Sequence, residues 1–434
     1  MLSNIPSSLS LLGALLPYLP PTLSHAAPWH PSSYTNVKSQ NNTICKPVSF
    51  TLTASAQHIS LSSPPDPTNS TAILETLNQA WDGTIVTNGT QTVSGTYTLK
   101  AIYCQPSSHS KPHKKGKKDK DDDVLQILLH GATYNKTLWS GYGFDYPYDW
   151  QSFAASQGYH TLAVDRLSHG DNDAQNLDPL NEVQMPLQTE LLHQLISLVK
   201  SPPKPKPNTN VTNPTTISLT PSKSNNPLHR TFPKIILVGH SLGSYLSVSL
   251  ARSYPLDPTA LILTGYSHQL NIPHVRSAPY FPAPLVFPTR FPSERYKNGL
   301  EYLTIATLEG RTNGFYSNET DAAGRVYDPA VARTDYEYSD ATTLGEVVSL
   351  GNWGEGAGEF EGPVLVATGR KDWICCSPPE EACVERLWET GRTFPKARRY
   401  EVWAPEETGH DLTLEFISAR ETLRVVHEFL GREV

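Results

Sequence analysis

The chain has few of the features that mark membrane proteins, nucleic-acid-binding proteins or metalloenzymes. Its formal net charge is -7 and only 18% of its 434 residues are charged, so no broad basic surface for nucleic acid is expected. After the N-terminal region, no apolar stretch is as long as a membrane span, which needs about 18 residues. There is no His-Glu-x-x-His motif, and the glycines between Gly351 and Gly358 lack the flanking strand and helix of a dinucleotide fingerprint. We therefore expect no cofactor, no metal, no nucleic-acid partner and no transmembrane segment.

Cysteine is also scarce, with five residues in the chain. An odd number leaves one cysteine over in an oxidising compartment. We expect Cys45 to pair with Cys104, because these residues flank the N-terminal strand region, and one of Cys375 or Cys376 to pair with Cys383. Zinc binding by the three C-terminal cysteines is less favoured, because neither their spacing nor a nearby histidine pair matches a zinc site.

The beginning of the chain predicts a secretory signal peptide, residues 1–26. An interrupted apolar run from Leu9 to Leu19 precedes small residues that suit cleavage after Ala26. The segment has no Lys or Arg and contains two prolines, so a disordered apolar tail is the alternative. Asn-x-Ser/Thr sequons favour passage through a glycosylating compartment. They start at Asn41, Asn69, Asn88, Asn135, Asn210 and Asn318. We expect residues 27–434 to form a secreted, extracellular glycoprotein.

Apolar strand patterns and helical patterns alternate along most of the chain. This alternation predicts an α/β fold with a mostly parallel sheet and helices on both faces. The region from Val48 to Tyr103 is rich in Thr, Ser and Val and predicts early antiparallel strands. The later strands are expected at 124–129, 160–165, 235–238, 260–264, 363–368 and 399–403. The helices are expected at 150–157, 187–200, 244–253, 380–390 and 412–430.

Three segments interrupt the alternation. Residues 107–123 carry blocks of Lys and Asp and predict a solvated, charged loop. Residues 201–230 are rich in Pro, Lys, Asn, Thr and Ser, which predicts a low-complexity insertion. Residues 268–361 are too many for a structureless loop in a compact domain. They predict an inserted cap over the sheet, whose proline and aromatic content suits an apolar substrate.

Residues 234–245 run an apolar strand into Gly-x-Ser-x-Gly and then into a helical pattern. In a nucleophile elbow the strand and the helix leave the turn so close together that side chains two positions either side of the serine would collide. Gly239 and Gly243 remove those side chains. The alternative is an ordinary turn whose serine caps the helix, but the strand context favours the elbow. Ser241 is therefore the candidate nucleophile, and the backbone N–H of Leu242 is a candidate oxyanion donor.

Three more motifs, together with the elbow, resemble those of the α/β-hydrolase fold superfamily. They are His130-Gly131-Ala132-Thr133 after a strand, Asp372 in Gly-Arg-Lys-Asp, and His410 in Gly-His-Asp near the end. The resemblance covers the chain from about residue 97 onward, and the order Ser, Asp, His is the one that this fold uses. It implies an α/β-hydrolase fold with a secreted esterase-like or lipase-like activity.

Each candidate residue has a chemical role. Ser241 becomes a nucleophile when His410 accepts its proton, and Asp372 orients His410 and stabilises its imidazolium. A second oxyanion donor is expected at the N–H of Ala132.

Other titratable residues are expected to have structural roles. We expect this of His130, His240 and His427, while Asp411 is poorly placed to hold the ring of its chain neighbour. The strand at 260–264 is followed by no carboxylate, which leaves Asp372 as the acid. Asp335 and Glu337 of the cap are the fallback.

The sequence thus predicts a secreted serine hydrolase that cleaves carboxylic esters through an acyl-enzyme. The expected partner is a small-molecule or lipid-like ester substrate. The same triad serves peptidases, lactonases, thioesterases and acyltransferases, because fold and triad do not determine the substrate. An alternative from another class is a non-catalytic extracellular binding protein.

Overall fold

The computed structural model describes most of the chain after its N-terminal segment. The described residues are 43–106, 124–172, 176–201, 226–317, 327–351, 355–376 and 378–434. The predicted signal peptide, the charged loop 107–123 and most of the insertion 201–230 lie outside them, as do the sequons at Asn41, Asn210 and Asn318.

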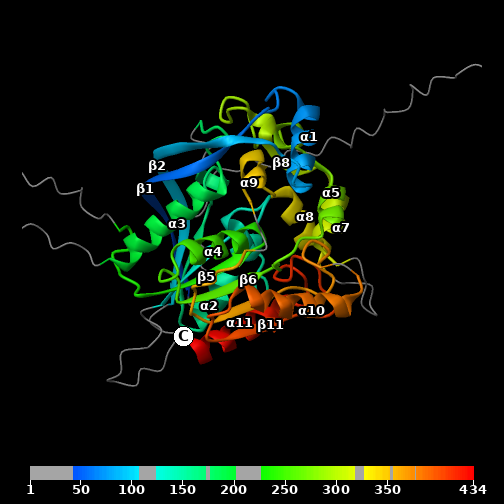
Figure 1. Ribbon diagram of the computed structural model, residues 1–434. Coiled ribbons are helices and arrows are strands. Elements are labelled where there is room, and N and C mark those ends of the chain that lie inside the picture. Colours follow the sequence, from blue (N-terminus) through cyan, green and yellow to red (C-terminus); the bar gives the residue numbers. More distant parts are fainter. Residues whose placement is uncertain are drawn as a thin grey trace, which may run out of the picture. The chain divides into compact units, whose positions relative to one another are not determined.

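An eight-stranded sheet, in the order β1-β2-β4-β3-β5-β6-β10-β11, forms the centre of the fold (Figure 1). The neighbours β1 and β2, and β2 and β4, are antiparallel, and all later neighbours are parallel. The strands are β1 Thr43–Leu61, β2 Thr87–Pro106, β3 Val124–Leu129, β4 His160–Val164, β5 Lys234–His240, β6 Ala260–Thr264, β10 Val364–Ala367 and β11 Tyr400–Trp403. The predicted mostly parallel sheet with antiparallel N-terminal strands is confirmed.

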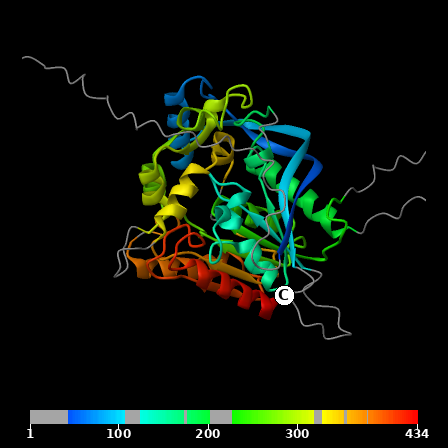
Figure 2. The same cartoon turned by 180° about the vertical axis from the view of Figure 1, so that it is seen from behind.

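Helices cover both faces of this sheet, which Figures 1 and 2 show from opposite sides. Successive strand side chains point to opposite faces, so Ile235 and Leu237 join one apolar core while Ile236 and Val238 join the other. The first core includes α3 (Met185–Lys200), α4 (Leu242–Ser253) and α10 (Glu380–Thr390). The second includes α2 (Trp150–Ser156) and α11 (Ala419–Glu433).

The described residues of 268–361 form short elements instead of continuing the alternation. A three-stranded antiparallel sheet has the order β7-β8-β9. The elements are α5 Ile272–Ser277, β7 Tyr280–Pro282, α6 Ala283–Val286, η5 Gly299–Glu301, β8 Tyr302–Ile305, α7 Leu308–Phe315, α8 Pro329–Glu337, β9 Thr342–Thr343 and α9 Leu344–Val348. Three further 3-10 helices are η3 Lys136–Gly143, η4 Gly170–Asn172 and η6 Gly391–Thr393.

Helix α1 (Ser70–Trp81) interrupts the region where only strands were predicted. Its N-terminus is capped by Asn69, and its buried residues Ile73 and Leu77 pack with Leu303 and Leu344 of the later insertion. Figure 1 shows α1 beside these elements. The helix was missed because its apolar stripe is short and its partner surface comes more than 200 residues later in the chain.

The last helix begins at Ala419, later than the predicted start at 412. The residues before it are held in turns, because Oε1 of Glu415 accepts hydrogen bonds from the N–H groups of Gly409 (2.8 Å) and Ser317 (3.1 Å). These bonds join segments far apart in sequence, which a local pattern does not record.

Two disulfides are present among the described residues. Cys45 faces Cys104 across the β1–β2 pair and is bonded to it, and Cys376 is bonded to Cys383. Cys375 keeps a buried free thiol. Of the helices in the described ranges, none combines the length and the apolar character needed to cross a bilayer.

Candidate active site

Ser241 lies at the sharp turn between β5 and α4, with φ 51° and ψ -119°. A non-glycine residue rarely adopts a positive φ, and such strain is concentrated at functional sites. A Cβ on Gly239 would lie 2.5 Å from the Cα of Ser244, and one on Gly243 would lie 2.1 Å from the carbonyl oxygen of Leu129. Both positions therefore require glycine, for the steric reason expected from the motif.

Asp372 and His410 form a buried pair in the loops that follow β10 and β11. The Nδ1 of His410 lies 2.7 Å from Oδ2 of Asp372. The other carboxylate oxygen, Oδ1, accepts hydrogen bonds from the N–H groups of Ile374 and Cys375, each at 3.0 Å. The carboxylate is thus held by the backbone, and it orients the imidazole ring.

The two partners shift each other's pKa in opposite directions. Burial disfavours the charged form of Asp372, but His410 and the backbone N–H groups outweigh burial and lower the pKa of this carboxyl. Burial likewise opposes the charge on His410, but Asp372 outweighs it and raises the pKa of the imidazole. The pair is therefore electrostatically suited to hold a proton on His410.

Ser241 and His410 both lie beside the residues at the end of β6. The N–H of Ser241 donates to the carbonyl of Thr264 at 2.9 Å. The next residue, Gly265, has φ 55°, and a Cβ there would lie 2.8 Å from Cε1 of His410. The Nε2 of His410 is buried and has no hydrogen-bond partner among the described residues. This nitrogen is available to accept a proton.

Arg166 holds the loop after β3 against the serine. Its Nε donates to the carbonyl of His130 (3.0 Å) and its Nη2 to the carbonyl of Gly131 (3.3 Å). The C=O and N–H of a trans peptide point in opposite directions, so the N–H of Ala132 points away from Arg166. A Cβ on Gly131 would lie 2.9 Å from the Cβ of Ser241, which shows how closely the loop approaches the serine.

The guanidinium of Arg166 is itself anchored by buried partners. Its Nη1 pairs with Glu346 of α9 and donates to Oε1 of Gln188 at 3.0 Å. Nε2 of His169 lies 2.9 Å from the same Glu346 carboxylate. Burial opposes the charge on Glu346, but Arg166 and His169 outweigh it and hold its pKa well below the usual range. A residue of the insertion therefore fixes the position of the loop that carries Ala132.

Ser241, Ala132 and Leu242 line one cavity of about 50 Å³. The N–H of Leu242 is the first of α4 and has no partner within the helix. The other lining residues are mostly apolar and come from α1, α4, the insertion and the loop after Asp372. They are Trp81, Tyr245, Leu270, His274, Val275, Ala278, Tyr280, Gly314, Phe315, Leu350 and Ile374. Trp81 and His274 belong to no recognisable motif, so their place in the cavity could not be predicted from the sequence.

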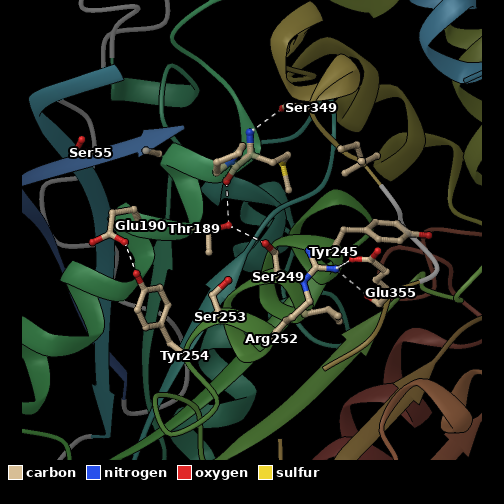
Figure 3. Close-up of a pocket in the computed structure, with 16 residues that line it drawn as sticks. Ser55, Thr189, Glu190, Tyr245, Ser249, Arg252, Ser253, Tyr254, Ser349 and Glu355 are labelled. Carbon is tan, nitrogen blue, oxygen red and sulfur yellow. Dashed lines mark hydrogen bonds and ion pairs between the residues drawn. The ribbon is translucent and has the colours of Figure 1, made fainter. Parts of the chain in front are cut away.

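A second, larger cavity of about 380 Å³ lies between α3, α4 and the segment after α9 (Figure 3). Polar side chains line much of it. They include Glu190, which accepts from the hydroxyl of Tyr254, and Arg252, which pairs with Glu355 at 2.9 Å. Tyr245 and Leu350 line both cavities. These two side chains therefore stand between the polar cavity and the one that contains Ser241.

The other histidines and the other aspartate near the candidate site have partners of their own. Asp411 accepts from the hydroxyl of Tyr134 and lies 3.2 Å from Nε2 of His240. His427 is buried on α11, where Nε2 lies 3.2 Å from Nε2 of Gln126. His130 accepts from the N–H of Arg166 through its Nε2 at 3.0 Å.

The fallback acids also lie elsewhere. Asp335 is buried in an ion pair with Arg311 at 2.7 Å, and Glu337 is exposed at the end of α8. Asp372 is therefore the carboxylate that His410 contacts.

One group of side chains of the kinds that bind metal ions lies close together in the described part of the chain. Donor atoms of Asp372, Cys375 and His410 lie within 4.8 Å of one another. The closest contact among them is the hydrogen bond between Asp372 and His410, which a metal bound there would break. The donor set therefore fits an acid–base pair better than a metal centre.

The described sequons differ in accessibility. Asn69 and Asn88 are exposed. Asn135 is half-buried, its Nδ2 donates to Asp340 at 3.3 Å, and its Oδ1 accepts from the N–H of Thr137 at 3.0 Å. A glycan on Asn135 would displace the contact with Asp340.

Comparison with known proteins identifies a family relationship. A family model described as "Alpha/beta hydrolase family" matches residues 126–424. No curated protein matches the sequence.

Several solved structures are similar in fold. A thermophilic esterase from Thermogutta terrifontis is 16% identical over 77% of this chain and 94% of its own, with a TM-score of 0.45. A monoacylglycerol lipase from Paleococcus ferrophilus is 15% identical over 70% and 93%, with a TM-score of 0.41. An enol-lactonase from Burkholderia xenovorans LB400 is 13% identical over 77% and 97%, with a TM-score of 0.45. At these identities and TM-scores the structures carry no argument about substrate.

Proposed function

The chain belongs to the alpha/beta hydrolase family, and from this premise we propose that it is a secreted serine hydrolase that cleaves carboxylic esters. One observation carries the proposal. The strained elbow serine, Ser241, lies beside the end of β6. The same turn adjoins a buried histidine, His410, whose Nδ1 contacts Asp372 and whose Nε2 has no hydrogen-bond partner among the described residues.

The proposed reaction begins when Oγ of Ser241 attacks the ester carbonyl while Nε2 of His410 takes the hydroxyl proton. Asp372 stabilises the imidazolium that forms. The N–H groups of Leu242 and Ala132 donate to the oxyanion of the tetrahedral intermediate, and removal of one such donor typically costs about 100- to 1000-fold in rate. His410 then protonates the departing alcohol, which leaves an acyl-enzyme. Water attacks this acyl-enzyme while His410 takes its proton, and His410 returns the proton to Ser241 as the carboxylic acid leaves.

The cavity around Ser241 favours esters with an apolar part. Its walls include Trp81, Val275 and Phe315. Peptidase, lactonase, thioesterase and acyltransferase activities would use the same residues, and a non-catalytic binding protein is the alternative outside enzymes.

Secretion is proposed on separate grounds. The predicted signal peptide, the exposed sequons at Asn69 and Asn88 and the two disulfides suit an oxidising, glycosylating compartment. Protein recovered from the culture medium should begin at Ala27, and N-terminal sequencing tests this. Retention in the cell with residue 1 intact would contradict secretion.

The decisive experiment is labelling of the folded protein with a fluorophosphonate probe, followed by peptide mass mapping. We expect modification at Ser241 that is absent from Ser241→Ala and present in Ser253→Ala, a control at an exposed serine of the same helix. Esters of graded chain length then test hydrolysis. A folded wild-type protein that neither reacts with the probe nor cleaves any ester would favour the binding-protein alternative.

A further inference from the structure

The cavity that contains Ser241 also contains a histidine that the proposed mechanism does not use. His274 of α5 lines the cavity, and its Nε2 is buried without a hydrogen-bond partner among the described residues. Buried polar atoms in native proteins are nearly always hydrogen-bonded. Because this unpaired nitrogen belongs to a residue that lines the cavity, a polar atom of a bound substrate can serve as its missing partner.

His274 is held by the segment that follows Asp372, and the backbone N–H groups of the same segment bond the Asp372 carboxylate. Asn271 caps α5, and its Oδ1 accepts from the backbone N–H of His274 at 3.5 Å. The N–H of Asn271 donates to the carbonyl of Ile374 (2.8 Å), and its Nδ2 donates to the carbonyl of Cys376 (3.1 Å). Since this segment directly follows Asp372, the start of α5 is positioned relative to Asp372 and His410.

The surroundings of the His274 ring determine its protonation state, and therefore whether Nε2 donates or accepts a hydrogen bond. Burial lowers the pKa of His274 and outweighs the backbone of Gly314 and the charge of Asp372, which favour protonation, while His410 also lowers it. The neutral ring has one N–H donor and one acceptor nitrogen. Because Nε2 has no partner, the hydrogen bond to the Gly314 backbone is assigned to Nδ1, which leaves a lone pair on Nε2.

We propose that His274 is a specificity-determining residue whose Nε2 accepts a hydrogen bond from a substrate hydroxyl. The preferred substrates are then hydroxylated esters, in which an alcohol group lies within a few bonds of the scissile carbonyl. The apolar walls of the cavity contact the hydrocarbon part of the same molecule. This inference rests on the proposed ester hydrolase function and adds a substrate class to it.

Matched ester pairs test the proposal. Methyl 3-hydroxybutyrate is compared with methyl butyrate, and 2-hydroxyethyl butyrate with propyl butyrate, so that the hydroxyl is placed on either side of the ester. We expect the wild-type enzyme to prefer the hydroxylated member of at least one pair. His274→Phe should reduce that kcat/KM ratio about tenfold or more, because the site loses the acceptor while the plain ester loses no contact.

Two further variants separate this role from a structural one. His274→Gln keeps a side-chain acceptor and should retain part of the preference. His268→Phe removes a half-buried histidine whose Nδ1 lies 2.9 Å from Oγ1 of Thr390 and which does not line the cavity, so the ratio should stay at the wild-type value.

Binding to Ser241→Ala protein, measured by calorimetry with the same esters, makes the test independent of turnover. The hydroxylated member should bind more tightly, and the difference should disappear when His274→Phe is added. Equal affinities for both members of both pairs would overturn the proposal. A hydroxyl preference that persists unchanged in His274→Phe would also overturn it. Failure of the proposed function is a different result, namely no labelling of Ser241 and no ester hydrolysis.

Discussion

Oδ2 of Asp372 lies 2.7 Å from Nδ1 of His410, and both side chains are almost fully shielded from solvent. The backbone N–H groups of Ile374 and Cys375 occupy the other carboxylate oxygen. The acid therefore cannot rotate without losing several hydrogen bonds. The contact sets both the orientation and the protonation of His410.

Replacing Asp372 by Asn removes the negative charge while the side-chain shape is kept. We expect kcat to fall by about 10⁴-fold, because the imidazole loses its correct tautomer and the stabilisation of its charged form. Ester hydrolysis by purified protein measures the loss. Asp257→Asn is the matched control, since Asp257 pairs with His193 at 2.6 Å outside the site and should be replaceable with little loss of activity.

The raised pKa of His410 predicts the acid limb of the pH–rate profile. His410 must be neutral to take the proton of Ser241, so kcat/KM should fall as the pH drops through the pKa of His410. The midpoint should lie above the ordinary histidine value of about 6.5. Residual activity of Asp372→Asn should show a lower midpoint. A wild-type midpoint below that of the variant would contradict the assignment of this pair.

Arg166→Lys tests whether Arg166 anchors the loop after β3, which carries the candidate oxyanion donor Ala132. Lysine keeps the charge but lacks the planar set of donors that reaches two carbonyls and Glu346 together. We expect kcat to fall about 100-fold with a smaller change in KM, since the Ala132 N–H would no longer be held in position. Arg252→Lys, at an exposed ion pair, should leave kcat unchanged.

Tyr245→Ala should join the cavity at Ser241 to the larger polar cavity beside it. We expect kcat/KM for bulky esters to rise relative to short ones, because the side chain lines both cavities. A chain-length series measures the change. Tyr254→Ala alters the larger cavity alone and should leave the preference as in wild type. An identical profile in all three proteins would show that the two cavities are not in communication.

His427 predicts a loss of stability in mild acid. Burial lowers its pKa to about 4, whereas the unfolded chain has a pKa near 6.5, so the unfolded state binds more protons between these values. The stability contribution of the neutral ring is therefore lost as the pH falls from 6.5 toward 4, and the loss between pH 6.5 and 5 should be about 1.5 kcal/mol. Urea unfolding at both pH values measures this difference. The pH dependence should be smaller in His427→Gln, and an equal dependence in both proteins would contradict the explanation.

The elbow and the sheet could be predicted from sequence because their requirements are local. Two glycines flank Ser241 at a spacing that sterics imposes, and each parallel strand is a short apolar run. The helices of the sheet layers also carry their apolar stripes within one contiguous segment, as in α3 and α4.

Helix α1 was missed for the opposite reason. Its apolar stripe is short, and the surface that buries it belongs to the insertion. Trp81 and His274 likewise line the cavity only because the tertiary structure brings α1 and α5 beside the turn at Ser241. Arg166 shows no motif, and its role depends on partners before it in the chain and on Glu346, 180 residues later.

The sequence by itself determined the alternating strands and helices of the parallel part of the central sheet, the strained turn at Ser241 and the loops that carry Asp372 and His410, because steric and periodic constraints act within a few residues. Only the tertiary structure decided that His410 contacts Asp372 while His240 contacts Asp411, that Arg166 holds the loop that carries Ala132, and that Trp81 and His274 line the cavity. Those contacts join residues distant along the chain, so no local pattern in the sequence records them.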